Sequence, residues 1–193
     1  MVSSAAAEMI SRARIVEAAR RRFEAFGYRR TSIAEIARAA GVAVGTVYRY
    51  FAGKEAVFLA VVQAMNDAWL AESRRALDGE GTAMERLRRL GAASISFAAE
   101  NALITAIITR DTDIVFAPLI EQLYEDMQRR NVAMIAEVIR DGIREGTFGD
   151  IDPERAAFVL FMSGGMLSLQ QNIPYADLVP VFEQIVYQGL LPR

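Results

Sequence analysis

Apolar residues recur at helical spacing along nearly the whole chain, and no segment alternates apolar and polar residues as a strand would. The pattern therefore predicts an all-α fold, with helices separated by glycine, by proline or by short polar runs. The predicted helices span, within a few residues, 11–26, 33–40, 44–50, 54–77, 82–100, 102–112, 118–145, 153–171 and 175–189.

The stretch from Thr31 to Lys54 predicts two short helices joined by a glycine turn. Ser32 is placed to cap the first helix, and Glu35, three residues on, completes a capping box. Gly41 can adopt the positive φ that ends a helix, and a second helix begins near Val44. This is the spacing of a helix-turn-helix, whose second helix enters the DNA major groove. The motif therefore predicts DNA binding.

These residues resemble the DNA-binding domain of the tetracycline-repressor (TetR) family of bacterial transcription regulators. The resemblance covers roughly residues 11–62 and is carried by Thr31, Ile36-Ala37, Ala40-Gly41-Val42, Gly45-Thr46-Val47-Tyr48-Arg49-Tyr50-Phe51 and Lys54. It implies about nine helices, arranged as a three-helix head joined to a larger helical body. Family members usually have serine before the recognition helix, where this chain has Ala43, which cannot cap backbone N–H groups. That helix is therefore expected to be capped from elsewhere or to start less firmly.

Charge divides the chain in the same place as the motif. Residues 1–54 carry ten basic and four acidic side chains, a net of +6, whereas the whole chain is −2, so that residues 55–193 carry −8. A basic end on an acidic body favours phosphate binding by that end, although arginine runs are also typical of solvated helix faces. We predict a helix-turn-helix DNA-binding domain at residues 1–54. The resemblance implies a ligand-binding and dimerisation domain at residues 55–193.

Position on the recognition helix predicts which residues meet DNA, because its N-terminal end reaches base edges while flanking residues hold phosphates. Gly45 permits close approach of the backbone to DNA, or else it only serves the turn. Arg49 is the only long cation on this helix and is therefore the candidate for a guanine or phosphate contact, or else it is merely solvated. Val47 and Phe51 are expected in the core of the head. The predicted groove-facing residues are Val44, Gly45, Thr46, Tyr48 and Arg49; the predicted phosphate contacts, partly by family analogy, are Thr31, Ser32, Tyr50 and Lys54.

The chain contains neither cysteine nor histidine, which excludes disulfide and thiol chemistry and removes the commonest metal ligand and general base. We read no signal peptide at the N-terminus. The uncharged run at residues 156–169 would reach only about 21 Å of a hydrocarbon core of roughly 30 Å. We therefore expect a soluble, cytoplasmic protein that is not an enzyme, with no cofactor, no metal and no membrane association.

The resemblance also implies that the body binds a small molecule, and that binding changes the spacing of two heads. No motif identifies the ligand, but without histidine or cysteine an apolar or aromatic ligand is favoured over a metal. Arg110, Asp111 and Asp113 form either a polar anchor or a solvated corner. The candidate pocket residues, each of which would serve equally in ordinary core packing, are Trp69, Phe97, Ile104, Ile108, Phe116, Tyr124, Met127, Phe161 and Met166.

A homodimer is expected, because one short recognition helix reads few bases and a two-fold protein suits a palindromic operator. The predicted interface comprises helices 156–171 and 175–189, where glycines in mid-helix at 164 and 165 indicate close helix approach or a kink. The predicted function is a repressor released from its operator by a small-molecule ligand. Two alternatives remain: a constitutive or architectural DNA-binding protein without a ligand, and an all-α enzyme that would have to use Asp111 and Asp113.

Overall fold

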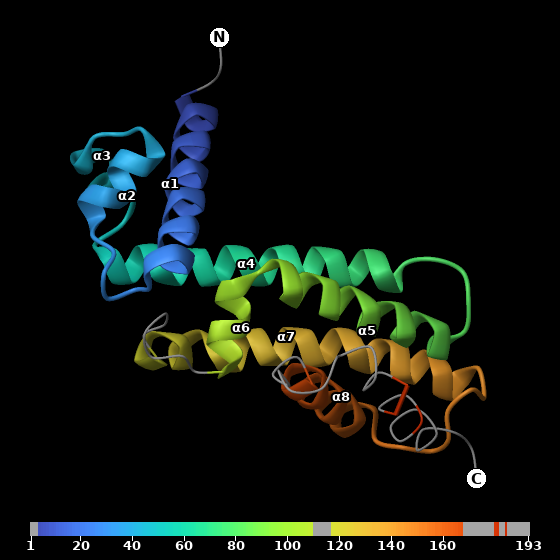
Figure 1. Cartoon of the computed structure of the whole chain (residues 1–193). Helices are drawn as coiled ribbons and strands as arrows, with labels where there is room; N and C mark the ends of the chain where they lie inside the picture. Colours follow the sequence, from blue (N-terminus) through green and yellow to red (C-terminus); the bar gives the residue numbers. More distant parts are fainter. Residues whose placement is uncertain (1–3, 110–116, 168–179, 182–183, 185–193) are drawn as a thin grey trace. The chain divides into compact units, whose positions relative to one another are not determined.

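The computed structural model describes residues 4–109, 117–167, 180, 181 and 184, and these residues contain helices and no strand (Figure 1). The described helices are α1 (Ser4–Phe26), α2 (Ile33–Ala40), α3 (Val44–Tyr50), α4 (Lys54–Leu77), α5 (Ala83–Glu100), α6 (Ala102–Thr109), α7 (Ala117–Arg144) and α8 (Pro153–Leu167). The all-α prediction is confirmed. The ninth predicted helix, at residues 175–189, falls almost entirely outside the described residues.

Most helix ends lie where local signals in the sequence place them. Thr82 caps α5 in a capping box with Glu85, and the Asp152 carboxylate accepts a hydrogen bond of 2.9 Å from the Arg155 backbone N–H at the start of α8. The exception is α1, which begins at Ser4, seven residues before its predicted start. Residues 5–7 are alanines, the best helix formers, so the helix extends further toward the N-terminus than the predicted start at residue 11.

The chain folds as two units, each of which is described by itself. The first comprises Met1–Asp67 and Ala102–Tyr124, and the second comprises Ala68–Asn101 and Glu125–Arg193. The division falls inside α4 and inside α7, so each of these two helices belongs to both units. The domain boundary predicted at residue 54 is the first residue of α4 and stays a prediction.

An aromatic cluster forms the core of the first unit. The Phe58 ring of α4 lies 5.3 Å from the ring of Phe23 in α1 and 5.1 Å from that of Tyr28, both edge to face. Phe23 and Phe58 are fully buried. Edge-to-face aromatic pairs add about 0.5–1.5 kcal/mol each beyond the burial of their surface. The cluster therefore joins α1, the turn after it and the first part of α4.

The second unit is held by an apolar cluster between the end of α4, α5, α7 and α8, which includes Leu77, Leu87 and Ile139. Gly142 of α7 lets the Phe148 ring pack directly on the helix backbone, and a Cβ at Gly142 would also stand 2.8 Å from the Cβ of Ala83. The close packing of Phe148 on α7 fixes the turn that leads into α8.

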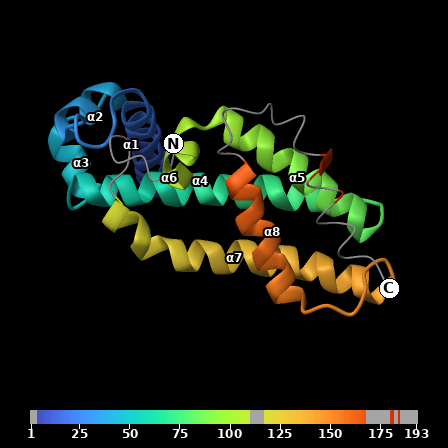
Figure 2. The ribbon, with the colours of Figure 1, turned by 60° about the horizontal axis from the view of Figure 1, so that its bottom comes forward.

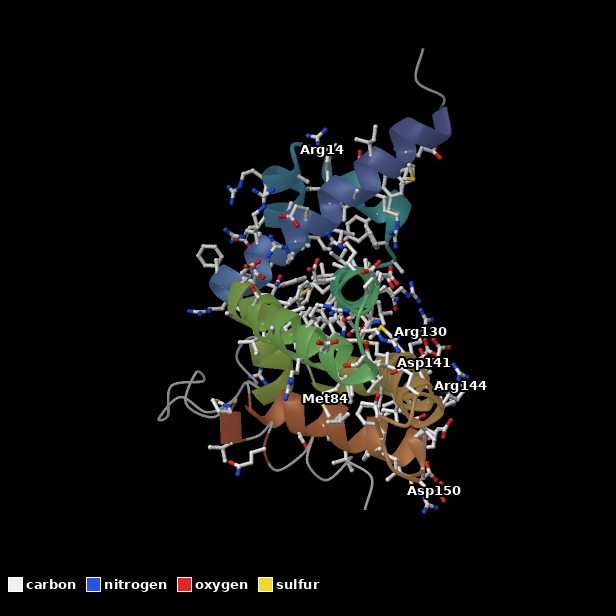
Figure 3. The ribbon with its side chains drawn as sticks, turned by 90° about the vertical axis from the view of Figure 1, so that its right-hand side faces the viewer. Arg14, Met84, Arg130, Asp141, Arg144 and Asp150 are labelled. Atoms are coloured by element: carbon white, nitrogen blue, oxygen red, sulfur yellow. The ribbon has the colours of Figure 1, made fainter. Side chains whose placement is uncertain are left out.

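Polar contacts add to this packing. Arg86 of α5 forms ion pairs with Asp141 at 3.0 Å and Glu145 at 3.3 Å, both in or just after the last turn of α7. Asp141 also pairs with Arg144, and these two side chains lie together at the end of α7 (Figure 3). Arg140 pairs with Glu154, so α8 starts beside α7 (Figure 2). No helix in the described part of the chain is long and apolar enough to cross a bilayer.

Candidate nucleic-acid interface

The predicted capping box at the start of α2 is confirmed. The Ser32 hydroxyl accepts a hydrogen bond of 3.3 Å from the Glu35 backbone N–H, and the Glu35 carboxylate accepts one of 2.8 Å from the Ser32 backbone N–H. Hydrogen bonds from the Ser32 backbone and hydroxyl hold the pKa of the Glu35 carboxyl below its ordinary value of 4.5. Arg22 of α1 pairs with the same carboxylate at 2.8 Å. Glu35 thus joins α2 to α1.

Replacing Glu35 with glutamine is expected to destabilise the protein at neutral pH and to have little effect in acid. Because the folded pKa lies below the ordinary 4.5, the carboxylate contributes its full stability above that value and loses it as the pH falls through the folded pKa. Thermal unfolding of the wild type and Glu35→Gln, from neutral pH to about pH 3, measures the difference. Glu8→Gln, at an exposed position of α1, is the control. A difference that does not shrink in acid would contradict this role.

The turn between α2 and α3 uses the predicted glycine. Gly41 has a φ of 67°, and its backbone N–H points back to the carbonyls of Ala37 and Arg38. Arg14 of α1 donates a hydrogen bond of 2.8 Å to the carbonyl of Ala40, which satisfies another acceptor at the end of α2 (Figure 3). Ala43 provides no side-chain cap for α3, so among the described residues this helix starts with backbone contacts alone.

The recognition helix α3 is divided into a buried side and an exposed side. Val47 and Phe51 are buried, as predicted for core residues of the head. Val44 and Tyr48 are instead 42% and 56% exposed, although both are large and apolar or aromatic. Gly45 is exposed as well, and a Cβ placed on it would meet no atom within 4 Å. Exposed apolar side chains on a short helix are typical of a surface that contacts a partner.

The remaining residues predicted on this surface differ in accessibility. Arg49 is exposed and donates a hydrogen bond of 3.1 Å to the Tyr50 hydroxyl, while Thr46 and Tyr50 are half-buried. Thr31 is buried, and its hydroxyl donates 2.9 Å to the carbonyl of Gly27, which gives it a role within the fold. The Lys54 ammonium donates 2.9 Å to the carbonyl of Tyr28 and lies 4.3 Å from the centre of that ring. Phosphate contact by these residues stays a prediction.

Two further cations of the head were not among the predicted contacts. Arg29, in the turn before α2, and Arg38, in the last turn of α2, are exposed and form no hydrogen bond or close ion pair among the described residues, although the charge of Arg38 helps to lower the pKa of Glu35. Other arginines of this region are engaged, as Arg20 is by Glu17 and Glu24. The sequence shows every arginine of the head but does not show which ones are neutralised by contacts in the fold. Arg29 and Arg38 are therefore additional candidates for phosphate contact.

The described candidates for the ligand pocket fall in both units. Trp69, Phe97, Met127 and Phe161 are half-buried in the second unit, whereas Ile104 is half-buried in α6 of the first. The rings of Trp69 and Phe97 lie 5.5 Å apart. The side chains of Ile108, Phe116, Tyr124 and Met166, and those of the charged cluster at residues 110–113, lie outside the described residues. No group of three or more potential metal ligands occurs in the described part of the chain.

A polar residue that sequence reasoning missed lies among these side chains. Asn131 of α7 is buried, and its Oδ1 accepts a hydrogen bond of 2.9 Å from the indole N–H of Trp69. The Asn131 amide also donates 2.9 Å to the carbonyl of Met127. The sequence did contain a signal for the burial of Asn131, because this residue lies at helical spacing from Ile135 and Ile139 on the inner face of α7.

Comparison with known proteins identifies the family. Residues 15–61 match the family model of bacterial regulatory proteins of the tetR family, and residues 80–168 match a tetracyclin repressor-like C-terminal domain. Over 138 residues the chain is 30% identical to the HTH-type transcriptional repressor KstR2 of Mycobacterium tuberculosis, an alignment that covers 71% of this chain and 68% of KstR2. The chain belongs to the TetR family. It is a DNA-binding transcriptional regulator, as the helix-turn-helix predicted.

Two other members of this family are similar over most of their length. The HTH-type transcriptional regulator YhgD of Bacillus subtilis is 28% identical over 146 residues, which is 76% of each chain. The structure of FadR from Bacillus subtilis in complex with stearoyl-CoA has a TM-score of 0.75 to this chain at 19% identity, covering 92% of this chain and 98% of FadR. The likeness to FadR shows a TetR fold in this chain.

Proposed function

We propose that this TetR-family regulator is a homodimeric repressor that binds a palindromic operator and leaves it when a small apolar or aromatic ligand binds. In this proposal residues 1–54 bind DNA, and residues 55–193 bind the ligand and dimerise. The observation that carries the DNA-binding part is the exposed side of α3, where Val44, Gly45, Tyr48 and Arg49 are all accessible. Apolar contact with thymine methyl groups and an arginine contact with guanine are what such a surface offers the major groove.

The proposed roles follow from accessibility and charge. Arg49 contacts a base. Gly45 lets the DNA backbone or base edges approach α3 closely, and the half-buried Thr46 makes a smaller contact with the DNA. Phosphates are held by the exposed Ser32, Arg29 and Arg38 and by the half-buried Tyr50 around α2 and α3. Thr31 and Lys54 act mainly by positioning the ends of α1 and α4. This division separates base reading from phosphate binding.

The proposed dimer uses α8 and the chain that follows it. Phe158 and Val159 of α8 are 44% and 55% exposed, which is unfavourable for large apolar side chains unless a partner covers them. Gly164 lies in the last described turn of α8, where glycine is less favourable than alanine by up to about 1 kcal/mol. A Cβ there would nevertheless meet no described atom of this chain within 4 Å. Close approach of a second copy would account for both features. To read a palindromic operator, such a dimer needs its two heads about 34 Å apart, one turn of DNA.

The proposed response to ligand passes along α4. Its first residue, Lys54, is hydrogen-bonded to the carbonyl of Tyr28 after α1, and its Trp69 contacts Phe97 and Asn131. A continuous helix transmits a displacement at one end to the other, so a ligand that shifts Trp69 would bias the position of the head. FadR of Bacillus subtilis, which shares the fold, binds stearoyl-CoA in its structure. The long acyl chain of stearoyl-CoA supports an apolar ligand for this protein as well.

Arg49→Ala is expected to weaken binding to the operator by about 1–3 kcal/mol per contact, and to weaken binding to scrambled DNA less. Fluorescence anisotropy with the DNA upstream of the regulator's own gene, and with scrambled DNA, measures both affinities at two salt concentrations. Arg75→Ala, an exposed arginine in the second unit, is the matched control. Equal losses on both DNAs would assign Arg49 to phosphate, and wild-type binding with no sequence preference would favour an architectural protein.

A further inference from the structure

Two contacts join the side chains of Arg49 and Tyr50 at the end of α3. The Arg49 Nη2 donates a hydrogen bond of 3.1 Å to the Tyr50 hydroxyl oxygen, and the guanidinium carbon lies 5.0 Å from the centre of the Tyr50 ring. That separation is within the range of a cation–π contact. Consecutive residues of a helix do not face each other, so the Arg49 side chain has to turn toward Tyr50 to make these contacts.

Tyr50 is the more firmly held of the two side chains. It is half-buried, whereas Arg49 is exposed, and it lies between the buried residues Val47 and Phe51. The Phe51 backbone N–H donates 3.0 Å to the carbonyl of Val47, which fixes the backbone on both sides of Tyr50. A tyrosine also loses less rotamer freedom than a long arginine side chain when it is held in one place. Tyr50 therefore orients Arg49, and not the reverse.

The hydroxyl that holds Arg49 is uncharged, unlike the partners of other arginines in the head. Arg20 pairs with two carboxylates of α1, and Arg22 pairs with Glu35 at 2.8 Å, so their charges are neutralised. The Tyr50 hydroxyl leaves the charge of Arg49 in place and takes only one of the five N–H donors of an arginine. A guanine accepts from two such donors, at O6 and N7. Arg49 is thus oriented and still able to contact a base.

The Tyr50 hydroxyl also has a hydrogen of its own to donate. Because its oxygen accepts from Arg49, this hydrogen points elsewhere, and none of the described residues accepts it. A DNA phosphate is the acceptor that the proposed function assigns to Tyr50. Consecutive hydrogen bonds polarise one another, so donation to a phosphate makes the phenol oxygen a better acceptor for Arg49. Phosphate binding by Tyr50 would therefore strengthen its hold on the guanidinium.

We propose that Tyr50 is a positioning residue for base reading, whose hydroxyl binds a phosphate and orients the Arg49 guanidinium toward a guanine. The inference rests on the base contact assigned to Arg49 under the proposed function. Tyr50 couples the register of α3 on the DNA backbone to the reading of a base. When α3 is displaced along the groove, the phosphate contact is lost and the hold on Arg49 weakens with it.

A double-mutant cycle distinguishes this coupling from two independent contacts. Tyr50→Phe, which keeps the ring and removes the hydroxyl, is made in the wild type and in Arg49→Ala. Anisotropy gives the affinities for the DNA upstream of the regulator's own gene and for scrambled DNA. In the wild type, Tyr50→Phe is expected to lower the preference for the upstream DNA about two- to tenfold for each head, the effect of one hydrogen bond. In Arg49→Ala it is expected to lower both affinities equally, because only the phosphate contact remains to be lost.

Tyr48→Phe is the matched control for this cycle. Tyr48 is the other tyrosine of α3, is 56% exposed, and makes no hydrogen bond to Arg49. Its effect on the preference is expected to be the same with and without Arg49. Thermal unfolding of Tyr50→Phe is expected to match that of the wild type. A lower midpoint, together with equal losses on both DNAs, would assign the Tyr50 hydroxyl to the stability of the head and would overturn the positioning role.

The cycle also separates this role from the base contact on which it rests. If Tyr50→Phe changes the preference equally in both backgrounds, or in neither, Tyr50 does not position Arg49, and Arg49 remains a base reader. If Arg49→Ala lowers the affinities for both DNAs equally, the base contact itself is contradicted, and the positioning role is overturned with it.

Discussion

Replacing Gly45 with leucine is expected to lower operator affinity about a thousandfold, if each of two heads loses about 2 kcal/mol and each 1.4 kcal/mol is a factor of ten. A side chain at this position has open space in the free protein, where a Cβ would meet no atom within 4 Å. Leucine is also a better helix former than glycine, by up to about 1 kcal/mol. The loss of affinity would therefore arise at the DNA interface, where the side chain holds α3 away from the groove.

Two measurements test this expectation together. Anisotropy gives the operator affinity of Gly45→Leu, and urea unfolding gives its free energy of unfolding, which is expected to match or exceed that of the wild type. Ala71→Leu adds similar bulk at an exposed position of α4 in the second unit and is expected to leave operator affinity unchanged. Undiminished operator binding by Gly45→Leu would show that α3 does not approach DNA through this residue, and would leave the glycine as a feature of the turn.

Phe58→Ala is expected to reduce the free energy of unfolding by about 3–5 kcal/mol, the usual cost of removing a buried phenylalanine side chain. Phe58 is fully buried and packs edge to face on Phe23 and Tyr28, so its loss opens a cavity where α1 and α4 meet. For a domain with a stability of about 5–15 kcal/mol, this is a large fraction of the total. Because the cluster also sets where α4 leaves the head, operator binding is expected to fall as well.

Urea unfolding of the full-length protein measures this change as a lower midpoint at similar slope. Phe26→Ala provides the control, since Phe26 lies in the same helix as Phe23 but is 43% exposed, with the Arg22 guanidinium stacked on its ring. Its expected cost is below about 1 kcal/mol, because less apolar surface is removed from the interior. Similar midpoints for the two variants would contradict the view that this cluster is the core of the first unit.

The features that sequence reasoning predicted correctly depend on residues close together along the chain. The predicted capping box joins Ser32 and Glu35, which are three residues apart, and the helix end at Gly41 depends on the conformation of a single residue. The burial of Val47 in α3 follows from helical spacing, which is also local. For this reason the helices, the turn and the family motif were all predictable without a structure.

Polar pairings between distant segments were not predictable in the same way. Arg14 and Ala40 are 26 residues apart, as are Lys54 and Tyr28, and both bonds form between a side chain and a carbonyl, which every residue possesses. A residue's type therefore does not reveal its partner. Family analogy and charge predicted that Thr31 contacts phosphate, and only the structure shows that its hydroxyl donates to the carbonyl of Gly27. Its phosphate contact stays a prediction.

By itself, the sequence determined the all-α class, the helix-turn-helix and membership of the TetR family, because local periodicity and capping specify helices wherever they later pack. Only the tertiary structure decided which side of α3 is exposed at Val44 and Tyr48, which arginines of the head are engaged by ion pairs within the fold, and that Trp69 meets Asn131, 62 residues away. Those outcomes depend on how helices approach one another, and that approach is set by the packing of side chains from distant segments, which no local pattern contains.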